Sequence, residues 1–263
     1  MISSMKSVIM FKKYLQIPWF FFRTLIYRLR ATTNFRNEFV SFSQNSNKKR
    51  FELRWEERIP MLYDNTGSTF FDRHYIYHTA WAARKIRTLG IRNHTDISSS
   101  LYFNTIISAF IDVEFYDYRP ANLVLDQLKT GSQDLTKLSF ESNSIMSLSC
   151  MHTIEHIGLG RYGDPIDYDG DIKAIHELCR VLAAKGNLFI VVPVGSESRI
   201  QFNAHRIYQP QSLIDEFEIK GMELKEFTLI PESPQDGHLV VNPEESLIQK
   251  QKYGCGCFWF TKN

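Results

Sequence analysis

The stretch NLFIVVPV, residues Asn187–Val194, constrains the fold of this 263-residue chain more than any other segment. Its apolar residues follow one another almost without interruption. This is typical of a central β-strand that is covered on both faces. The segment before it, DIKAIHELCRVLAA at residues 171–184, repeats apolar residues at helical spacing. A helix that leads into such a strand indicates a sheet between two helical layers.

Helical and strand patterns alternate along most of the chain. Helical patterns cover residues 69–91, 101–110, 171–184 and 210–219, and strand patterns cover residues 94–98, 113–118, 144–150, 187–194, 223–230 and 253–262. This alternation predicts a doubly wound α/β fold with a mostly parallel sheet. The last two strands have no helix between them, so we expect an antiparallel hairpin at the C-terminal edge of the sheet.

Acidic residues follow successive predicted strands. Ligands of an open parallel sheet bind beyond the carboxyl ends of the strands. Asp96 begins the segment DISSS at the end of the first strand, and Asp117 ends the second strand. Asp134 lies in the segment TGSQDLTKL, before the next strand. An acid at the position of Asp117 can accept both hydroxyls of a ribose, and one at Asp134 can accept the amine of a purine. A nucleoside site and ordinary turn residues both remain open as interpretations.

The segment HTIEHIGLGRYGDP, residues 152–165, begins with the H-x-x-E-H spacing of some zinc peptidases. A zinc site of that kind needs both histidines on one helix and a third ligand. Here the motif follows an apolar strand directly, and two glycines end any helix, so we expect no resident metal. Two alternatives remain, a divalent cation at Asp164, Asp167 or Asp169 and a capped turn with His156 satisfied in the core.

The order of these segments resembles the class I S-adenosylmethionine (SAM) dependent methyltransferases. The segments are DISSS, Asp117, SQDL, SLSCMHTIEHIG and HELCRVLAAKGNLFIVVPVG. The segments EHIGLGRYGDPID and FNAHRIY are similar to a bacterial methyltransferase-like group of unassigned function that is associated with surface-polysaccharide gene sets. The resemblance covers roughly residues 70–260. It implies a seven-stranded Rossmann-like sheet with an antiparallel C-terminal hairpin.

The resemblance also implies which residues hold the cofactor. By position, the methionine part of SAM would contact Asp96, Ser98 and Ser100, and the ribose would contact Asp117. The adenine would contact Asp134 and Leu135, and the sulfonium would face Met151 and His152. One feature departs from the family. Its pattern at the first loop is an acid followed by alternating glycines, which let the backbone approach the cofactor closely. This chain has serines at both glycine positions.

The loop after the strand at residues 144–150 is the candidate acceptor site. Transfer of a methyl group to a hydroxyl requires removal of a proton, which a histidine or a carboxylate with a raised pKa can accept. We expect His156 to be the base, with Glu155 or Asp164 as its orienting partner and His205 as the rival base. We expect Arg161 and Arg206 to hold an anionic or polyhydroxylated acceptor, Tyr162 to stack on a sugar, and Tyr75 to face the cofactor. An amphipathic core helix is the alternative for the segment of Tyr75.

Residues 1–50 differ in charge from residues 51–263, the predicted methyltransferase-like domain. They hold ten lysines and arginines and one acid, which gives +9 in a chain with net charge +2. The run at residues 8–30 is aromatic and basic, and its charges disfavour a signal peptide or a membrane span. Residues 1–35 are therefore predicted to contact either an anionic membrane surface or the domain itself.

These observations predict a cytoplasmic methyltransferase, peripheral on the inner membrane face, that acts on an oxygen of a sugar. The sugar would belong to a surface glycan or to its nucleotide-activated or lipid-linked precursor. The serine-rich first loop favours one alternative, a degenerate methyltransferase fold that binds or scaffolds without SAM turnover. Nucleic acid is disfavoured as a partner because residues 51–263 are net acidic. The four cysteines are expected to be buried thiols in a reducing compartment.

Overall fold

The computed structural model describes the backbone of residues 2–44 and 51–263, and the side chains of residues 22–44 and 51–263. The chain divides into two compact units, Met1–Phe70 and Phe71–Asn263. Residues 51–70, which the sequence analysis assigned to the methyltransferase-like domain, therefore group with the N-terminal helix.

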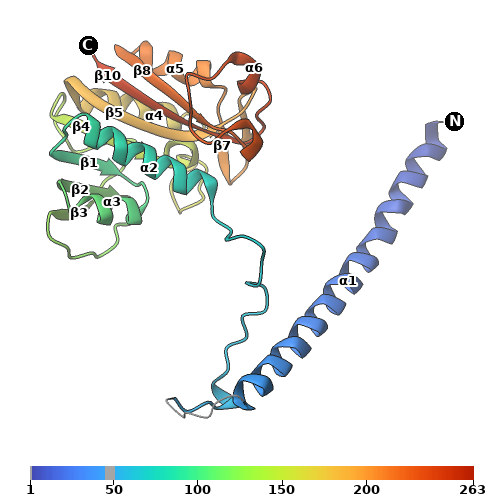
Figure 1. The fold of residues 1–263 in the computed structure, drawn as a ribbon. Coiled ribbons are helices and arrows are strands. Elements are labelled where there is room, and N and C mark those ends of the chain that lie inside the picture. The colour runs from blue at the N-terminus through green and yellow to red at the C-terminus, as the bar shows by residue number, and fades with distance from the viewer. Residues whose placement is uncertain (1, 45–50) are drawn as a thin grey trace. The chain divides into compact units, whose positions relative to one another are not determined.

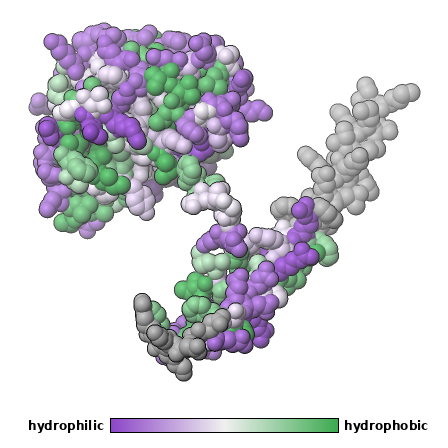
Figure 2. Space-filling view, viewed as in Figure 1, coloured by the Kyte–Doolittle hydropathy of each residue, from purple (hydrophilic) through white to green (hydrophobic). Residues whose placement is uncertain are grey.

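The N-terminal unit consists of helix α1 (Ile2–Gln44) and an extended segment with one 3-10 turn, η1 (Trp55–Glu57). The ring of Trp55 packs on Phe35 and Phe39 of α1, with centroid distances of 6.2 and 4.8 Å. These contacts explain why residues 51–70 group with α1. Along the coloured part of α1, hydrophobic and hydrophilic surfaces lie side by side (Figure 2). Within the described residues, no helix has the length and apolar character that crossing a membrane requires.

The second unit is built on an eight-stranded sheet with the order β3-β2-β1-β4-β5-β10-β8-β9 (Figure 1). In that order the strands span Leu128–Ser132, Asp112–Asp117, Asn93–Ile97, Ile145–Met151, Leu182–Val194, Gly254–Lys262, Met222–Ile230 and Val240–Val241. Strands β1 to β5 are parallel, and β10, β8 and β9 pair antiparallel. The predicted doubly wound sheet with an antiparallel C-terminal pair is confirmed, with the two-residue β9 as an additional edge strand.

Helices cover both faces of the sheet. Helices α2 (Arg73–Thr88) and α3 (Leu101–Ile107) pack on one face, and α4 (Gly170–Val181) and α5 (Pro210–Glu218) pack on the other. Strand β5 shows the reason, because Phe189 and Val191 point to the first layer while Leu188 and Ile190 point to the second. The apolar run at residues 187–194 is therefore buried on both faces, as expected.

Strand β10 lies inside the sheet, between β5 and β8, and not at its edge. Its sequence explains this position. Cys255 and Cys257 join the core under α2, while Phe258 and Phe260 join the core under α4 and α5. A strand that is apolar on both faces is stable only where other elements cover both faces. The short strand β9 therefore forms this edge of the sheet.

Short elements complete the domain. They are the 3-10 turns η2 (Ile154–His156) and η3 (Pro234–Asp236), the hairpin of β6 (Arg199–Gln201) and β7 (His205–Ile207), and helix α6 (Glu245–Ile248). Neither β3 nor the β6–β7 hairpin was predicted from the sequence. These strands are short, and their residues are polar or partly exposed, so the sequence shows no periodic apolar pattern there.

A buried histidine joins β1 to β4. The ring of His94 contacts the hydroxyls of Ser147 and Ser149 at 2.7 and 2.9 Å through its two nitrogens. Burial lowers the pKa of His94 to about 3. The folded protein therefore keeps this ring neutral at pH values where the same ring is protonated in the unfolded chain.

The first prediction is that His94 contributes to acid destabilisation. Below pH 6.5 the unfolded chain gains a proton that folded His94 does not bind, so the free energy of unfolding falls. Between pH 7 and pH 5 this amounts to about 2 kcal/mol. The variant His94→Gln should be less stable at pH 7 but should lose about 2 kcal/mol less over this interval, as measured by urea unfolding. Equal losses in both proteins would contradict the prediction.

Candidate active site

A cavity of roughly 440 Å³ opens at the carboxyl ends of β1, β2 and β4. Its volume is in the range of small-molecule sites. The residues that line it come from α2, from the end of β2, from the loops that follow the strands and from the start of α4: Tyr75, Ser98, Asp117, Tyr118, Arg119, Gln133, Asp134, Leu135, Thr136, His152, Thr153, His156, Ile157, Gly158, Tyr162, Asp164, Pro165, Asp167 and Lys173. The cavity therefore lies where the topology predicts a ligand site.

Two acids face one end of the cavity. Asp117 Oδ1 accepts a hydrogen bond from the backbone N–H of Arg119 at 2.8 Å. Asp134 Oδ1 accepts bonds from the N–H and hydroxyl of Thr136 at 2.8 and 2.7 Å. In the described part of the chain only Oδ1 of each acid makes such bonds, so Oδ2 of each is available to a ligand. Leu135 also lines the cavity and adds an apolar side chain to its wall.

Three predicted cofactor residues lie behind the cavity wall. Asp96 is fully buried and accepts hydrogen bonds from Ser99, Asn104 and Ser149. Burial raises the pKa of its carboxyl. Met151 belongs to the core, and its N–H donates to the hydroxyl of Ser99 at 2.9 Å. Neither these two residues nor Ser100 line the cavity. We correct their role to support of the loop after β1.

Ser98 does line the cavity, in a backbone conformation that favours glycine. Its φ is 60°, and its N–H donates to the carbonyl of Tyr116 at 2.7 Å. Most residues with a Cβ avoid this left-handed region. The serine therefore has the backbone that a glycine at this position would adopt, and the loop keeps its shape at some cost in stability.

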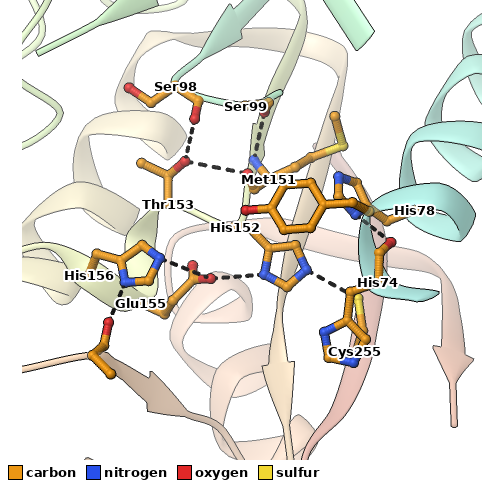
Figure 3. A network of polar contacts seen from close by, with 12 residues as sticks. His74, His78, Ser98, Ser99, Met151, His152, Thr153, Glu155, His156 and Cys255 are labelled. Carbon is orange, nitrogen blue, oxygen red and sulfur yellow. Dashed lines mark hydrogen bonds and ion pairs between the residues drawn. The ribbon is translucent and has the colours of Figure 1, made fainter. Parts of the chain in front are cut away.

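His152 is the centre of a buried cluster of rings and polar groups (Figure 3). It follows β4 with a φ of 56°, another left-handed residue. Its ring stacks on His74 and Tyr75, at centroid distances of 5.6 and 5.3 Å. Nδ1 is 2.9 Å from Glu155 Oε1, and Nε2 is 3.5 Å from Cys255 Sγ. Burial lowers the pKa of His152 to about 4, so its ring is neutral at pH 7.

Glu155 and His156 form the polar end of this cluster. Burial raises the pKa of Glu155 to about 7, and its Oε2 has no hydrogen-bond partner among the described residues. His156 Nδ1 lies 2.7 Å from the carbonyl of Ala204, which only accepts, so this nitrogen carries the ring proton. His156 Nε2 is then the basic nitrogen, 3.7 Å from Glu155 Oε1. Burial also lowers the pKa of His156.

An exposed tyrosine with two arginines forms the outer part of the site. The guanidinium groups of Arg119 and Arg161 lie 5.1 and 5.0 Å from the ring centroid of Tyr162. The edge of the same ring faces His156 at 5.6 Å. Arg119 was not identified from the sequence, because an Arg before a Pro at the end of a strand is an ordinary turn pattern.

Arg206 does not line the cavity of the candidate site, although the sequence suggested it as an acceptor-binding residue. It is buried and donates to the carbonyls of Ile157 and Tyr168 at 2.6 and 2.9 Å, and it lies 3.4 Å from Asp171. These partners hold the site loop to α4, and Arg206 contributes to the wall of a separate cavity of roughly 300 Å³.

Asp164 and His205 also differ from their predicted roles. Asp164 lines the cavity, but its carboxylate accepts from the N–H groups of Gly158, Gly160 and Tyr162 at 2.8, 3.4 and 3.2 Å, so it shapes the loop. His205 is not part of the cavity wall, and its ring lies tilted against that of Tyr253, at a centroid distance of 5.1 Å. His156 is therefore the better placed base of the two histidines.

The histidines of H-x-x-E-H are not one helical turn apart. The end of the motif forms the single 3-10 turn η2, and both rings approach Oε1 of Glu155, at 2.9 and 3.7 Å. The other nitrogen of His152 contacts Cys255, whereas that of His156 contacts the carbonyl of Ala204. His152 and His156 therefore do not have the arrangement that a zinc peptidase requires. All four cysteines are free and buried, as predicted.

Comparison with known proteins identifies the fold. Residues 132–233, less than half of the chain, match the family described as "Caenorhabditis protein of unknown function, DUF268". No curated protein matches the chain. The structure is similar to a candidate sarcosine dimethylglycine methyltransferase from Galdieria sulphuraria, with a TM-score of 0.51 and 12% identity over 70% of this chain and 85% of that one. It is also similar to the YcgJ protein of Bacillus subtilis, with a TM-score of 0.50 and 13% identity over 71% and 99% of the two chains. At these identities the comparisons establish the Rossmann-like methyltransferase fold.

The second prediction concerns the serine loop. Ser98→Gly should raise the free energy of unfolding by about 1 kcal/mol, because glycine adopts the left-handed backbone without strain. Ser100 has an ordinary φ of −64° and no capping bond from its side chain. The matched variant Ser100→Gly should therefore lower stability by about 0.5 kcal/mol. Chemical denaturation of the three proteins measures both changes, and equal signs for the two variants would refute the interpretation.

Proposed function

We propose that this protein is a SAM-dependent methyltransferase that modifies a hydroxyl of a sugar. One observation carries the proposal: a ligand-sized cavity at the carboxyl edge of a methyltransferase-type sheet presents Asp117 and Asp134 with one free carboxylate oxygen each. Their positions after β2 and β3 fit the ribose and the adenine of a nucleoside. The fold alone supports many reactions, so the proposal rests on these residues.

The residues that would hold the cofactor are a subset of those predicted. Asp117 would accept the ribose hydroxyls, Asp134 and Leu135 would meet the adenine, and Ser98 and His152 would line the remaining wall. SAM, when bound, supplies an activated methyl group with a good leaving group. The protein therefore has to position the acceptor and to accept its proton.

His156 is suited to accept that proton. Its Nδ1 is held by the carbonyl of Ala204, which fixes the tautomer and leaves Nε2 basic. Glu155, 3.7 Å from Nε2, would stabilise the ring once it is protonated. With the pKa of Glu155 at about 7, this stabilisation is present above neutral pH and decreases as the pH falls and the carboxylate takes up a proton.

The outer part of the site supports a sugar acceptor. Tyr162 offers a ring for stacking, and the two flanking guanidinium groups of Arg119 and Arg161 suit hydroxyls or a phosphate. A nucleotide-activated or lipid-linked precursor of a surface glycan has both features. The two guanidinium groups in the outer part of the site would not strengthen the binding of an amine acceptor.

The third prediction is that the protein binds SAM through Asp117. Asp117→Asn should weaken binding by roughly tenfold or more, because a hydrogen bond to a charged group is lost. Isothermal titration calorimetry with SAM and with S-adenosylhomocysteine measures this effect. Asp126→Asn, which changes an exposed acid outside the cavity, is the matched control and should bind as the wild type does.

The same titration distinguishes the enzyme from a degenerate binding protein. Absence of heat and of a thermal shift with millimolar SAM would contradict the proposal and would favour a scaffold whose serine loop no longer admits the cofactor. Equal affinities of the two Asp variants would instead remove Asp117 from the site.

The fourth prediction assigns the base. His156→Ala should reduce turnover by about 100-fold or more while SAM affinity changes little. Transfer of labelled methyl groups to nucleotide-sugar and lipid-linked sugar fractions measures turnover, and calorimetry measures affinity. His176→Ala on α4, away from the cavity, is the control. Loss of SAM binding together with turnover would mean that His156 is structural, and full turnover in the variant would exclude it as the base.

A further inference from the structure

Three potential metal ligands from separate parts of the domain converge beside the cavity. His74 comes from the first turn of α2, His152 from the loop after β4, and Cys255 from β10 (Figure 3). One ligand atom from each residue lies within 4.8 Å of the other two. His152 also lines the cavity, so the cluster adjoins the candidate active site.

The distance between Cys255 and His152 suits a tetrahedral ion, and the donor of His74 lies within 4.8 Å of both. For Zn–N bonds of 2.0–2.1 Å and a Zn–S bond of 2.3 Å, tetrahedral angles put the nitrogen and sulfur about 3.6 Å apart. The Sγ of Cys255 and the Nε2 of His152 are 3.5 Å apart. A thiol hydrogen bond to His152 has a similar length, but it does not explain why His74 brings a third donor to the same point.

A hydrogen bond orients one of the ligands, and ring stacking holds a second. Glu155 Oε1 holds Nδ1 of His152 at 2.9 Å, which directs the lone pair of Nε2 toward Cys255. Metal-binding histidines almost always donate their second ring N–H to a carboxylate or a carbonyl in this way. The ring of His74 stacks on the ring of Tyr253, at a centroid distance of 5.1 Å.

The order Cys255, His152, Glu155 also resembles a nucleophilic triad, in which a histidine activates a thiol. Burial argues against that chemistry. Cys255 is 0% exposed, so a substrate cannot reach its sulfur. A small ion between the sulfur and the two rings needs no such access, and the strained backbone of His152 keeps its ring aimed at that point.

We propose that His74, His152 and the thiolate of Cys255 form a zinc site, with Glu155 as a positioning residue. Two imidazoles and a thiolate select zinc over magnesium or calcium. Cys255 would lose its proton to solvent when the ion binds. Three protein ligands leave a fourth position for water or for an atom of the acceptor, the pattern of zinc sites that take part in chemistry.

Metal titration of the full-length, untagged and metal-stripped protein tests this site without SAM or an acceptor. We expect one Zn²⁺ per chain by elemental analysis after dialysis. Co²⁺ in its place should give a thiolate-to-cobalt charge-transfer band. Absence of stoichiometric zinc and of this band would overturn the proposal. A failure to bind SAM would contradict only the proposed function, because the two measurements are independent.

Matched variants identify the ligands. Cys255→Ser should abolish the charge-transfer band and weaken zinc binding by about 100-fold or more, whereas Cys179→Ser, which changes a buried thiol on α4, should leave both unchanged. His74→Asn is a second variant at a less buried residue, in case Cys255→Ser does not fold, and it should also weaken binding. Glu155→Gln should weaken it by about tenfold. Wild-type affinity in His74→Asn, or a band retained in Cys255→Ser, would refute the assignment.

Discussion

Burial of β5 and β10 on both faces is the constraint on which the rest of the domain depends. Phe189 and Val191 of β5 need the layer of α2 and α3, and Leu188 and Ile190 need the layer of α4 and α5. Strand β10 adds Cys255 to the first layer and Phe258 to the second. Because both strands must be central, the parallel strands extend from one side and the antiparallel pair from the other. The carboxyl edge that results is the edge that carries the cavity.

A buried cation then fixes the loop at that edge. Arg206 ties the carbonyls of Ile157 and Tyr168 to Asp171 at the start of α4. Removal of one member of a buried ion pair typically costs 3–5 kcal/mol, on the order of a large share of a domain's stability. The position of His156 against Ala204 therefore depends on a residue outside the cavity of the candidate site.

Much of the fold could be predicted from sequence, and less of the site. The strands with continuous or alternating apolar residues and the helices with an apolar face were recognised, because burial leaves a periodic signal. Strand β3 and the β6–β7 hairpin leave none. Asp117, Asp134 and His156 line the cavity because they lie at or after the carboxyl ends of parallel strands, which meet at one edge of the sheet. Arg206 and Asp96 were assigned to ligands because a sequence does not show that a charged side chain is already satisfied by buried carbonyls or hydroxyls.

The residue pattern of the chain was enough to predict the layered α/β sheet, the edge at which the cavity opens and the importance of the loop after β4. Which side chains come together in space could be learned only from the three-dimensional structure. His74 and Cys255 are far from His152 along the chain, and they meet it only because α2 crosses over β10, so no spacing rule relates them. The apparent zinc motif H-x-x-E-H contributes His152 to this cluster but not His156, because a 3-10 turn after a strand points the two rings in different directions.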